Sequence, residues 1–282
     1  MTEQEIDELF AVTLTCEYDD ENPWAAVSKL RMNGNQSIFE KASAWCQSPE
    51  PRKRARASDI LCQLRVPKSV AQEEAKTFGE PIFVHDSFQI LSRMIDQEID
   101  ETALESEIHG LGHLGPDGAV SILVPYATHA SEDVRFAVTC SLGCFANDPM
   151  AVETLMALSE DHDDDIRNWA LFALASQSDA DSPVLREVFV RHLIDPYSDV
   201  QEESIAGLAK RQDPRAALPL LRLMESGSFY SHHQYDFAAF IGENLDLEHW
   251  GTEDFIDALY IRFPHLLPIR NTADPNTDST IN

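Results

Sequence analysis

The sequence has few basic side chains for its length. Against 49 Asp and Glu it holds 21 Lys and Arg, which gives a formal net charge of −28 at pH 7. Residues 1–70 are near balance, with 9 basic and 11 acidic side chains, whereas residues 71–282 hold 12 and 38. Because nucleic acids are bound largely by Lys and Arg that displace counterions, this charge argues against DNA or RNA as a partner. An acidic field instead accelerates encounter with a basic protein.

Long apolar runs and paired cysteines are also missing. No stretch approaches the roughly 18 apolar residues of a membrane span, and the acidic first residues lack a signal peptide's basic and then apolar order. The five cysteines are an odd number without a Cys-x-x-Cys pair. We therefore expect a protein of the reducing cytoplasm without membrane contact. Cys140 and Cys144, four residues apart, are interpreted as buried thiols of one helix face.

The most informative feature that is present is a phrase written three times. It begins with Asp-Val/Ile-Arg/Gln at Asp133, Asp165 and Asp199, and each copy ends nine residues later in Leu. The copies recur after 32 and then 34 residues. Apolar or small side chains stand one, five, eight and nine residues after the Asp, which is one stripe of a helix. A period this short indicates stacked pairs of helices.

The helical pattern extends along most of the chain. Helices that bear the phrase or its remnant are predicted at about 101–114, 132–145, 164–177 and 198–211. They alternate with apolar helices at about 118–129, 149–159, 183–194 and 214–225. The predicted organisation is an N-terminal helical cap with a degenerate repeat (1–80), a repeat array (81–226), C-terminal capping helices (227–270) and a disordered tail (271–282).

Acidic and basic residues at the predicted helix starts have structural interpretations. Just before a helix, the carboxylate of the repeated Asp would accept hydrogen bonds from free backbone N–H groups and oppose the positive helix end. Asp199 and Glu202 also have the spacing of a capping box. The basic run at residues 52–56 is interpreted as the solvated start of a helix rather than a nucleic-acid patch. None of these groups requires a catalytic role.

The three phrases, with the endings Ser141-Leu-Gly, Ala173-Leu-Ala and Gly207-Leu-Ala, resemble HEAT repeats, and their short period resembles the PBS-lyase HEAT-like branch. The resemblance is clear over about 100–226. It implies an all-α fold, an α-α superhelix (HEAT/armadillo-type solenoid of antiparallel helix pairs), whose second helices line a concave face that holds partners. Members of the family range from scaffolds to a few enzymes, so the resemblance does not choose a function.

Three motifs that suggest a ligand fail on their context. Gly110 to Gly115 spells Gly-x-Gly-x-x-Gly, but it ends a predicted helix instead of joining a strand to one. The acidic run at 160–165 would start a calcium loop, yet Ile166 and Phe172 stand where that loop needs Gly and Glu. The histidine pair at 232–233 has no matched carboxylate or cysteine nearby, so it is interpreted as loop or helix start.

His109 and His113 are the strongest candidates for a metal site. They stand four residues apart on one helix, and deoxyhypusine hydroxylases, relatives of this repeat family, hold two irons with several His-Glu pairs. This chain has no His-Glu dipeptide, and Glu107 lies on another face than His109. We therefore predict neither a metal nor a cofactor, and no catalytic nucleophile is recognisable.

Aromatic residues occupy positions that this repeat usually gives to polar ones. Three and seven residues after the Asp, side chains point away from the apolar stripe, and here these positions include Phe136 and Phe172, with Trp169 one step aside. Exposed aromatic groups anchor protein partners. The predicted partner-binding residues are these three together with Arg135 and Arg167. In the alternative interpretation, Phe136 and Trp169 pack against each other between repeats.

The first functional hypothesis is a monomeric, non-enzymatic scaffold or adaptor that binds a basic protein on the concave face. The alternative is an enzyme or accessory subunit of the lyase or hydroxylase type. A bilin lyase would need a chromophore cavity, for which the sequence offers no sign.

Overall fold

The structure is a computed structural model that describes residues 1–68, 78–115, 118–227, 233–242 and 251–269. It divides into two compact units, Met1–Ala180 and Asp181–Asn282. Helices form the ordered elements of both. Within the described ranges, extended pairing is limited to an isolated antiparallel bridge between Arg65 and Pro81, and no helix there is long and apolar enough to cross a membrane.

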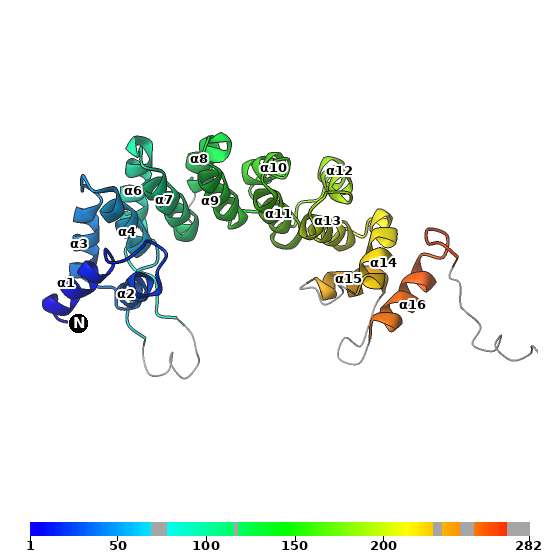
Figure 1. Cartoon of the computed structure of the whole chain (residues 1–282), viewed down its shortest axis with the longest axis horizontal. Helices are drawn as coiled ribbons and strands as arrows, with labels where there is room; N and C mark the ends of the chain where they lie inside the picture. The colour runs from blue at the N-terminus through cyan, green and yellow to red at the C-terminus, as the bar shows by residue number, and fades with distance from the viewer. Residues whose placement is uncertain (69–77, 116–117, 228–232, 243–250, 270–282) are drawn as a thin grey trace, which may run out of the picture. The chain divides into compact units, whose positions relative to one another are not determined.

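The first unit begins with four helices and continues with pairs (Figure 1). The opening helices are α1 (Glu3–Val12), α2 (Glu21–Met32), α3 (Gln36–Trp45) and α4 (Pro51–Leu61). The paired helices are α6 (Val84–Met94), α7 (Glu101–Leu114), α8 (Ala119–Leu123), α9 (Glu132–Gly143), α10 (Pro149–Leu158) and α11 (Asp164–Phe172). Short 3₁₀ turns follow α6 and α8 (Ile95–Gln97 and Val124–Thr128), and a π-helical turn, Ala173–Gln177, extends α11.

Two rows of helices make up the repeat part of the first unit. Helices α6, α8 and α10 form one row, and α7, α9 and α11 form the other, which we call the second-helix row (Figure 1). Helix α7 packs on α4 and on α9, and α9 packs on α11. The predicted apolar stripe lies in these contacts, because the repeated Leu111, Leu142 and Leu174 are fully buried. The close approach needs small residues: a Cβ at Gly112 would lie 2.7 Å from Ser141 of the neighbouring helix.

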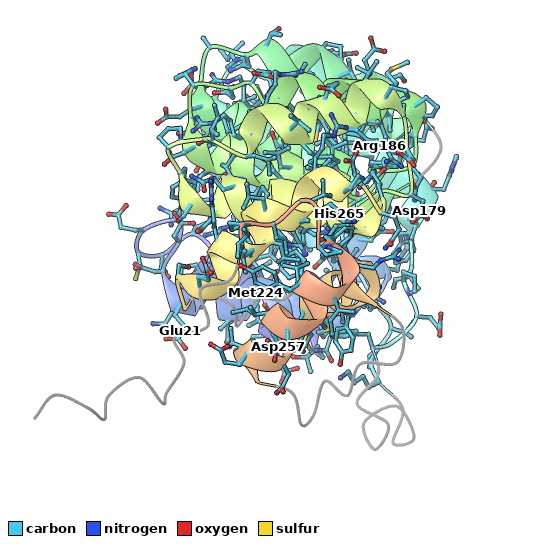
Figure 2. The ribbon with its side chains drawn as sticks, turned by 90° about the vertical axis from the view of Figure 1, so that its right-hand side faces the viewer. Glu21, Asp179, Arg186, Met224, Asp257 and His265 are labelled. Atoms are coloured by element: carbon cyan, nitrogen blue, oxygen red, sulfur yellow. The ribbon has the colours of Figure 1, made fainter. Side chains whose placement is uncertain are left out.

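The second unit holds one more repeat and its closing helices. Its elements are α12 (Pro183–His192), α13 (Ser198–Lys210), a 3₁₀ turn (Pro214–Ala216), α14 (Ala217–Glu225), α15 (Gln234–Ile241) and α16 (Thr252–Arg262). Helix α13 packs on α12 and α15, and α16 packs on α14 and α15. Met224 of α14 is buried in this core, whereas Asp257 of α16 is exposed (Figure 2).

The repeated Asp does not cap its helix, so that prediction was wrong. Helices α9, α11 and α13 begin one residue before Asp133, Asp165 and Asp199, which are therefore the second helical residues. In α11 the cap is Asp163, whose side chain accepts a hydrogen bond from the Ile166 N–H at 3.0 Å. The predicted capping box at Asp199 is absent for the same reason. The repeated carboxylates still lie in the first turn, where their negative charge interacts favourably with the positive end of the helix dipole.

The third residue of the phrase holds the turn that precedes its helix. Its side chain reaches back and donates to the carbonyl oxygen six residues before it: Arg135 to His129 at 2.9 Å, Arg167 to Asp161 at 3.0 Å and Gln201 to Asp195 at 2.6 Å. Arg54 of α4, in the degenerate repeat, makes the equivalent bond to Ser48 at 2.9 Å. This bond closes the turn between the two helices of a pair. The turn is therefore held by the Arg or Gln, and the Asp is free to lie inside the helix.

Most predicted helices are confirmed within a few residues. The predicted span 118–129 is divided between α8 and the 3₁₀ turn that follows it, and 164–177 between α11 and its π-helical turn. Helix α2 begins at Glu21, with Asp20 before it. The boundary between the two units falls inside the range 81–226 assigned to one array, whose limits stay a prediction. The predicted tail at 271–282 lies outside the described residues.

Candidate partner-binding face

The predicted aromatic residues come together on the second-helix row of the first unit. The ring centroids of Phe136 in α9 and Trp169 in α11 are 6.2 Å apart, and those of Trp169 and Phe172 are 5.6 Å apart, both edge-to-face. Phe136 and Phe172 are half-buried, while Trp169 remains 43% exposed. Phe136 and Trp169 therefore pack against each other, as the alternative interpretation expected, and the cluster of three still faces solvent. We call it the aromatic cluster.

Arg135 lies beneath this surface rather than on it. Its side chain is 6% exposed, and its guanidinium donates to both carboxylate oxygens of Asp161, at 2.7 and 3.1 Å. Burial alone would raise the pKa of Asp161, but bonding to Arg135 and to the Asp163 N–H lowers it. Arg167 is half-buried and donates to the backbone of the turn that precedes α11. Both arginines therefore hold the frame on which the aromatic cluster lies.

Arg54 repeats the Arg135 arrangement at the other end of the unit. It donates to both carboxylate oxygens of Glu98, at 2.7 Å each, and these bonds help lower the pKa of Glu98 to about 2 although burial opposes the shift. In both pairs the acid stands in the turn before the next second helix. The basic run at 52–56 is therefore not a solvated helix start, because Arg54 is paired and Arg56 is fully buried. Sequence spacing alone did not reveal these partners.

A pocket of about 290 Å³ is lined by residues of α2, α4 and α7 and of the segment before α2. Glu105 and His109 of α7 occupy the repeat positions that hold Phe136 and Cys140 in α9. They line the pocket with Asp19 and Trp24, which come from the segment before α2 and from α2 itself. Burial raises the pKa of Glu105 to about 7, and the carboxylates of Asp133, Asp19 and Asp59 add to this effect. We call this cavity the Glu105 pocket.

The floor of the Glu105 pocket is a fully bonded polar network. The Tyr18 hydroxyl lies 2.6 Å from both Asp59 Oδ2 and Ser106 Oγ. The buried Arg56 guanidinium donates to Asp59 Oδ2 at 3.0 Å and stacks 3.7 Å from the centre of the Tyr18 ring. Because each group has a partner, the floor is held in one arrangement. Asp59 is thereby neutralised locally, which leaves Asp19 and Glu105 as the acids toward the opening.

The two histidines of α7 line this pocket and do not form a metal site with Glu107. Burial and the neighbouring His113 lower the pKa of His109 to about 4, so its ring is neutral at pH 7. Glu107 is fully buried on another face of α7, and its two oxygens have no hydrogen-bond partner among the described residues. Burial and the nearby Glu98 carboxylate raise its pKa to about 9. The described ranges contain no group of three or more His, Cys, Asp or Glu placed to hold a metal ion.

The other motifs have structural roles. Gly115 ends α7 with a left-handed φ of 63°, and Asp161 and Asp163 of the acidic run bond Arg135 and cap α11. Cys140 is half-buried, but Cys144 is exposed, which corrects the prediction of two buried thiols. Burial nevertheless raises the pKa of Cys140 to about 12 and also raises that of Cys144. Neither thiol is poised to ionise near pH 7.

His233 has a carboxylate partner that sequence distance concealed. It is 1% exposed at the start of α15, and its Nε2 lies 2.9 Å from Oε2 of the buried Glu203 in α13. Burial alone would lower the pKa of His233, but Asp236 and Glu203 outweigh it and raise the pKa to about 9. The interpretation of His233 as a helix-start residue is confirmed, but its carboxylate partners, Glu203 and Asp236, were not predicted. Residue 232 lies outside the described residues.

The Glu105 pocket was missed from the sequence although a signal for it existed. Helix α7 has lost the Asp-Val-Arg start of its repeat, which conceals its outward positions. Counting back from Leu111 places Glu105 and His109 three and seven residues after the missing Asp. Tyr18, Asp19 and Trp24 carry no such signal, because they precede the repeats and reach the pocket only through tertiary packing.

Two features define an all-α repeat fold of the HEAT/armadillo type. The helices are paired around a buried stripe of Leu residues, and side-chain hydrogen bonds close the turns between them. In agreement with this class, residues 90–175 match the family described as HEAT repeats. The chain therefore has the fold of HEAT-like repeat proteins.

Its relatives include YibA of Escherichia coli. The YibA proteins of strains K12 and O157:H7 are each 26% identical to this chain over 234 residues, covering 79% of the chain and 76% of YibA. The crystal structure of E. coli YibA matches with a TM-score of 0.66 at 21% identity, over 93% of this chain and 94% of that one. An engineered protein matches with a TM-score of 0.50 at 16% identity, over 93% and 72%. These structural likenesses concern the fold.

Proposed function

We propose that the protein is a monomeric, non-enzymatic interaction module that holds a basic protein partner on the second-helix row of its first unit. The contact would be centred on Phe136, Trp169 and Phe172. Repeat folds of this kind offer extended surfaces that hold partners. Arg135 and Arg167 enter the proposal as supports of the aromatic cluster. A cytoplasmic location is part of the proposal, and the five unpaired cysteines support it.

The observation that carries the proposal is the exposure of Trp169 within an aromatic cluster. An indole that is 43% exposed has apolar area still to bury, and Phe136 and Phe172 hold its ring edge-to-face. Rigid, partly exposed aromatic side chains are the residues that most often dominate interface energetics. Burying this cluster under a partner would remove its apolar area from water at little cost in side-chain entropy.

The charge around the cluster supports a basic partner. Exposed carboxylates stand in the first turns of α9 and α11, namely Glu132, Asp133, Asp164 and Asp165. Residues 71–282 as a whole carry 38 acidic against 12 basic side chains. A basic partner would therefore approach faster than a neutral one, and added salt would screen this attraction.

The test is capture of partners from the native host at low salt, followed by an affinity measurement with purified partner. Truncation of interface aromatics often costs about 2 kcal/mol or more, so we expect Phe136→Ala with Phe172→Ala to weaken binding by at least about tenfold. Met150→Ala is the matched control, because Met150 is 49% exposed but lies on α10 in the other row. Failure to enrich any basic protein, or equal affinity of the double variant, would contradict the proposal.

A further inference from the structure

The Glu105 pocket and the aromatic cluster belong to one continuous row of helices. Glu105 in α7 and Phe136 in α9 occupy the same repeat position, 31 residues apart, and these two helices pack directly against each other. Asp133, at the start of α9, faces Glu105 closely enough to raise its pKa. A partner segment lying on the aromatic cluster would therefore pass the opening of the pocket.

Acidic groups reach the pocket from separate elements. Asp19 comes from the segment before α2, Asp59 from α4 and Glu105 from α7, and all three line the cavity. Asp59 is bonded by Arg56 and Tyr18. Asp19 and Glu105 form no ion pair with any Lys, Arg or His in the described part of the chain. Two acids at one opening thus repel each other without a cation between them.

The cations already at the pocket are bonded to groups other than Asp19 and Glu105. Arg31 is the cationic lining residue, and its Nε donates to the Asp59 carbonyl oxygen at 2.6 Å while its guanidinium lies 5.5 Å from the centre of the Trp24 ring. Arg56 is buried below Tyr18. His109 is neutral at pH 7, and the pKa of His113 is also lowered by burial. No resident group therefore neutralises the Glu105 side of the cavity.

We infer that the Glu105 pocket receives one cationic side chain, arginine or lysine, from the basic partner segment that lies on the aromatic cluster. This inference rests on the proposed function and deepens it. The cavity, at about 290 Å³, has room for one long side chain, and Trp24 provides an apolar wall for its methylene stem. The cation would lie between Glu105 and Asp19 and relieve their repulsion. The aromatic cluster would supply affinity, and the pocket would select a basic residue at one position of the partner.

The pH dependence of binding follows from the groups that face Glu105. These are Asp19, Asp59 and Asp133, and the pocket is also lined by the neutral His109, by His113, by Tyr18 and by Arg31. Because these surroundings and burial raise the pKa of Glu105 to about 7, the carboxyl is partly protonated at neutral pH. A cationic side chain binds the ionised form of Glu105, so its binding displaces the proton from the Glu105 carboxyl group. Affinity for a cationic side chain should therefore rise between pH 6 and pH 8.

The test uses the full chain and three small probes: N-acetyl-arginine amide, N-acetyl-lysine amide and N-acetyl-citrulline amide. Citrulline has nearly the shape of arginine without its charge. Binding is followed by the NMR signal of the Trp24 indole N–H. We expect the arginine or lysine probe, but not the citrulline probe, to shift this signal, and the two cationic probes to show which side chain fits better. Glu105→Gln should weaken binding by about tenfold, equivalent to one pKa unit of interaction.

Controls separate this inference from the proposed function. Glu101→Gln, at the exposed first residue of the same helix, should leave probe binding unchanged, and circular dichroism should confirm that both variants are folded. Equal shifts with citrulline, or unchanged binding in Glu105→Gln, would overturn the pocket assignment. If a basic partner still depended on Phe136 and Phe172 in that case, the proposed function would stand alone. If the probes bound but no partner used the aromatic cluster, the proposed function would fail instead.

Discussion

The same repeat position is open in the first unit and covered in the second. In α11, Trp169 and Phe172 stand four and seven residues after the repeated Asp and reach solvent. In α13 the equivalent residues are Glu203 and Ala206, which are 4% and 1% exposed because α15 packs on this helix. The same repeated sequence phrase therefore occurs in a helix with an exposed outward side and in a helix with a covered one. The difference arises from whether a later helix of the same unit occupies the outward side.

The two units also differ in whether a buried acidic side chain has a basic partner. The covered face contains Glu203 with His233, an acid and a base at 2.9 Å. In the first unit, Glu107 is buried on the inward side of α7 without a hydrogen-bond partner in the described ranges, and its pKa of about 9 keeps it protonated. A paired charge can fasten a covering helix, whereas an unpaired acid is tolerated only in its neutral form.

Replacing His233, the basic residue of the covered face, should have the largest effect on stability. His233→Ala removes the imidazole that lies 2.9 Å from the buried Glu203 carboxylate. Breaking a buried pair typically costs about 3–5 kcal/mol, so we expect α15 to detach in the variant. Urea unfolding monitored by circular dichroism, with hydrogen exchange in α15, measures the loss. The folded-state pKa of His233 is raised, so its stabilisation is complete below pH 6.5 and is lost as the pH rises through about 9. A variant penalty that persists unchanged at pH 10 would contradict this account.

Placing an aromatic residue on the covered face should cost somewhat less. Ala206→Phe copies the side chain of Phe172 to a position that is 1% exposed, where the added ring must displace neighbouring side chains. Overpacking of this kind costs about 1–3 kcal/mol. The reverse change, Phe172→Ala, should cost less because its ring is only half-buried. Equal losses in the two variants would show that the faces do not differ as described.

Replacing the buried acid of the first unit should stabilise it. Glu107→Gln keeps the shape of the side chain but removes its ionisable carboxyl group. In the wild type this group stays protonated in the folded chain up to a pH of about 9, whereas in the unfolded chain it loses its proton above pH 4.5. Since the folded pKa is raised, the stability of the wild type is complete below pH 4.5 and declines as the pH rises toward 9. We expect a gain of roughly 1–2 kcal/mol at pH 8 and none at pH 4. Thermal unfolding at the two pH values provides the comparison, and a destabilised variant at pH 8 would refute it.

The smallest expected effect on stability belongs to the exposed aromatic residue. Trp169→Ala should change the free energy of unfolding by less than about 0.5–1 kcal/mol, because much of the indole already faces solvent. The same variant should weaken partner binding strongly. Urea unfolding and affinity measured on one preparation distinguish the two roles. A large loss of stability with unchanged affinity would assign Trp169 to the core.

The fold was largely predictable because its signals are local. The spacing of the stripe that ends in Leu142 and Leu174 follows from helix geometry, and it located the second helices to within a few residues. The aromatic cluster was predictable for the same reason, since the stripe identifies the positions that point outward. The function of Asp133 was mistaken because capping was argued from the Asp alone. The turn is closed instead by the bond from Arg135 to the carbonyl oxygen six residues earlier.

The sequence by itself determined the repeat, the direction in which each second-helix side chain points and the excess of negative charge, because each depends on residue type and on a period of a few residues. Tertiary structure alone decided which outward positions stay exposed and which charges meet. Glu203 meets His233 across 30 residues and Arg54 meets Glu98 across 44, and Asp19, from a segment outside the repeat pattern, lines the same pocket as Glu105. Such contacts depend on how whole helices stack, and no local period encodes that.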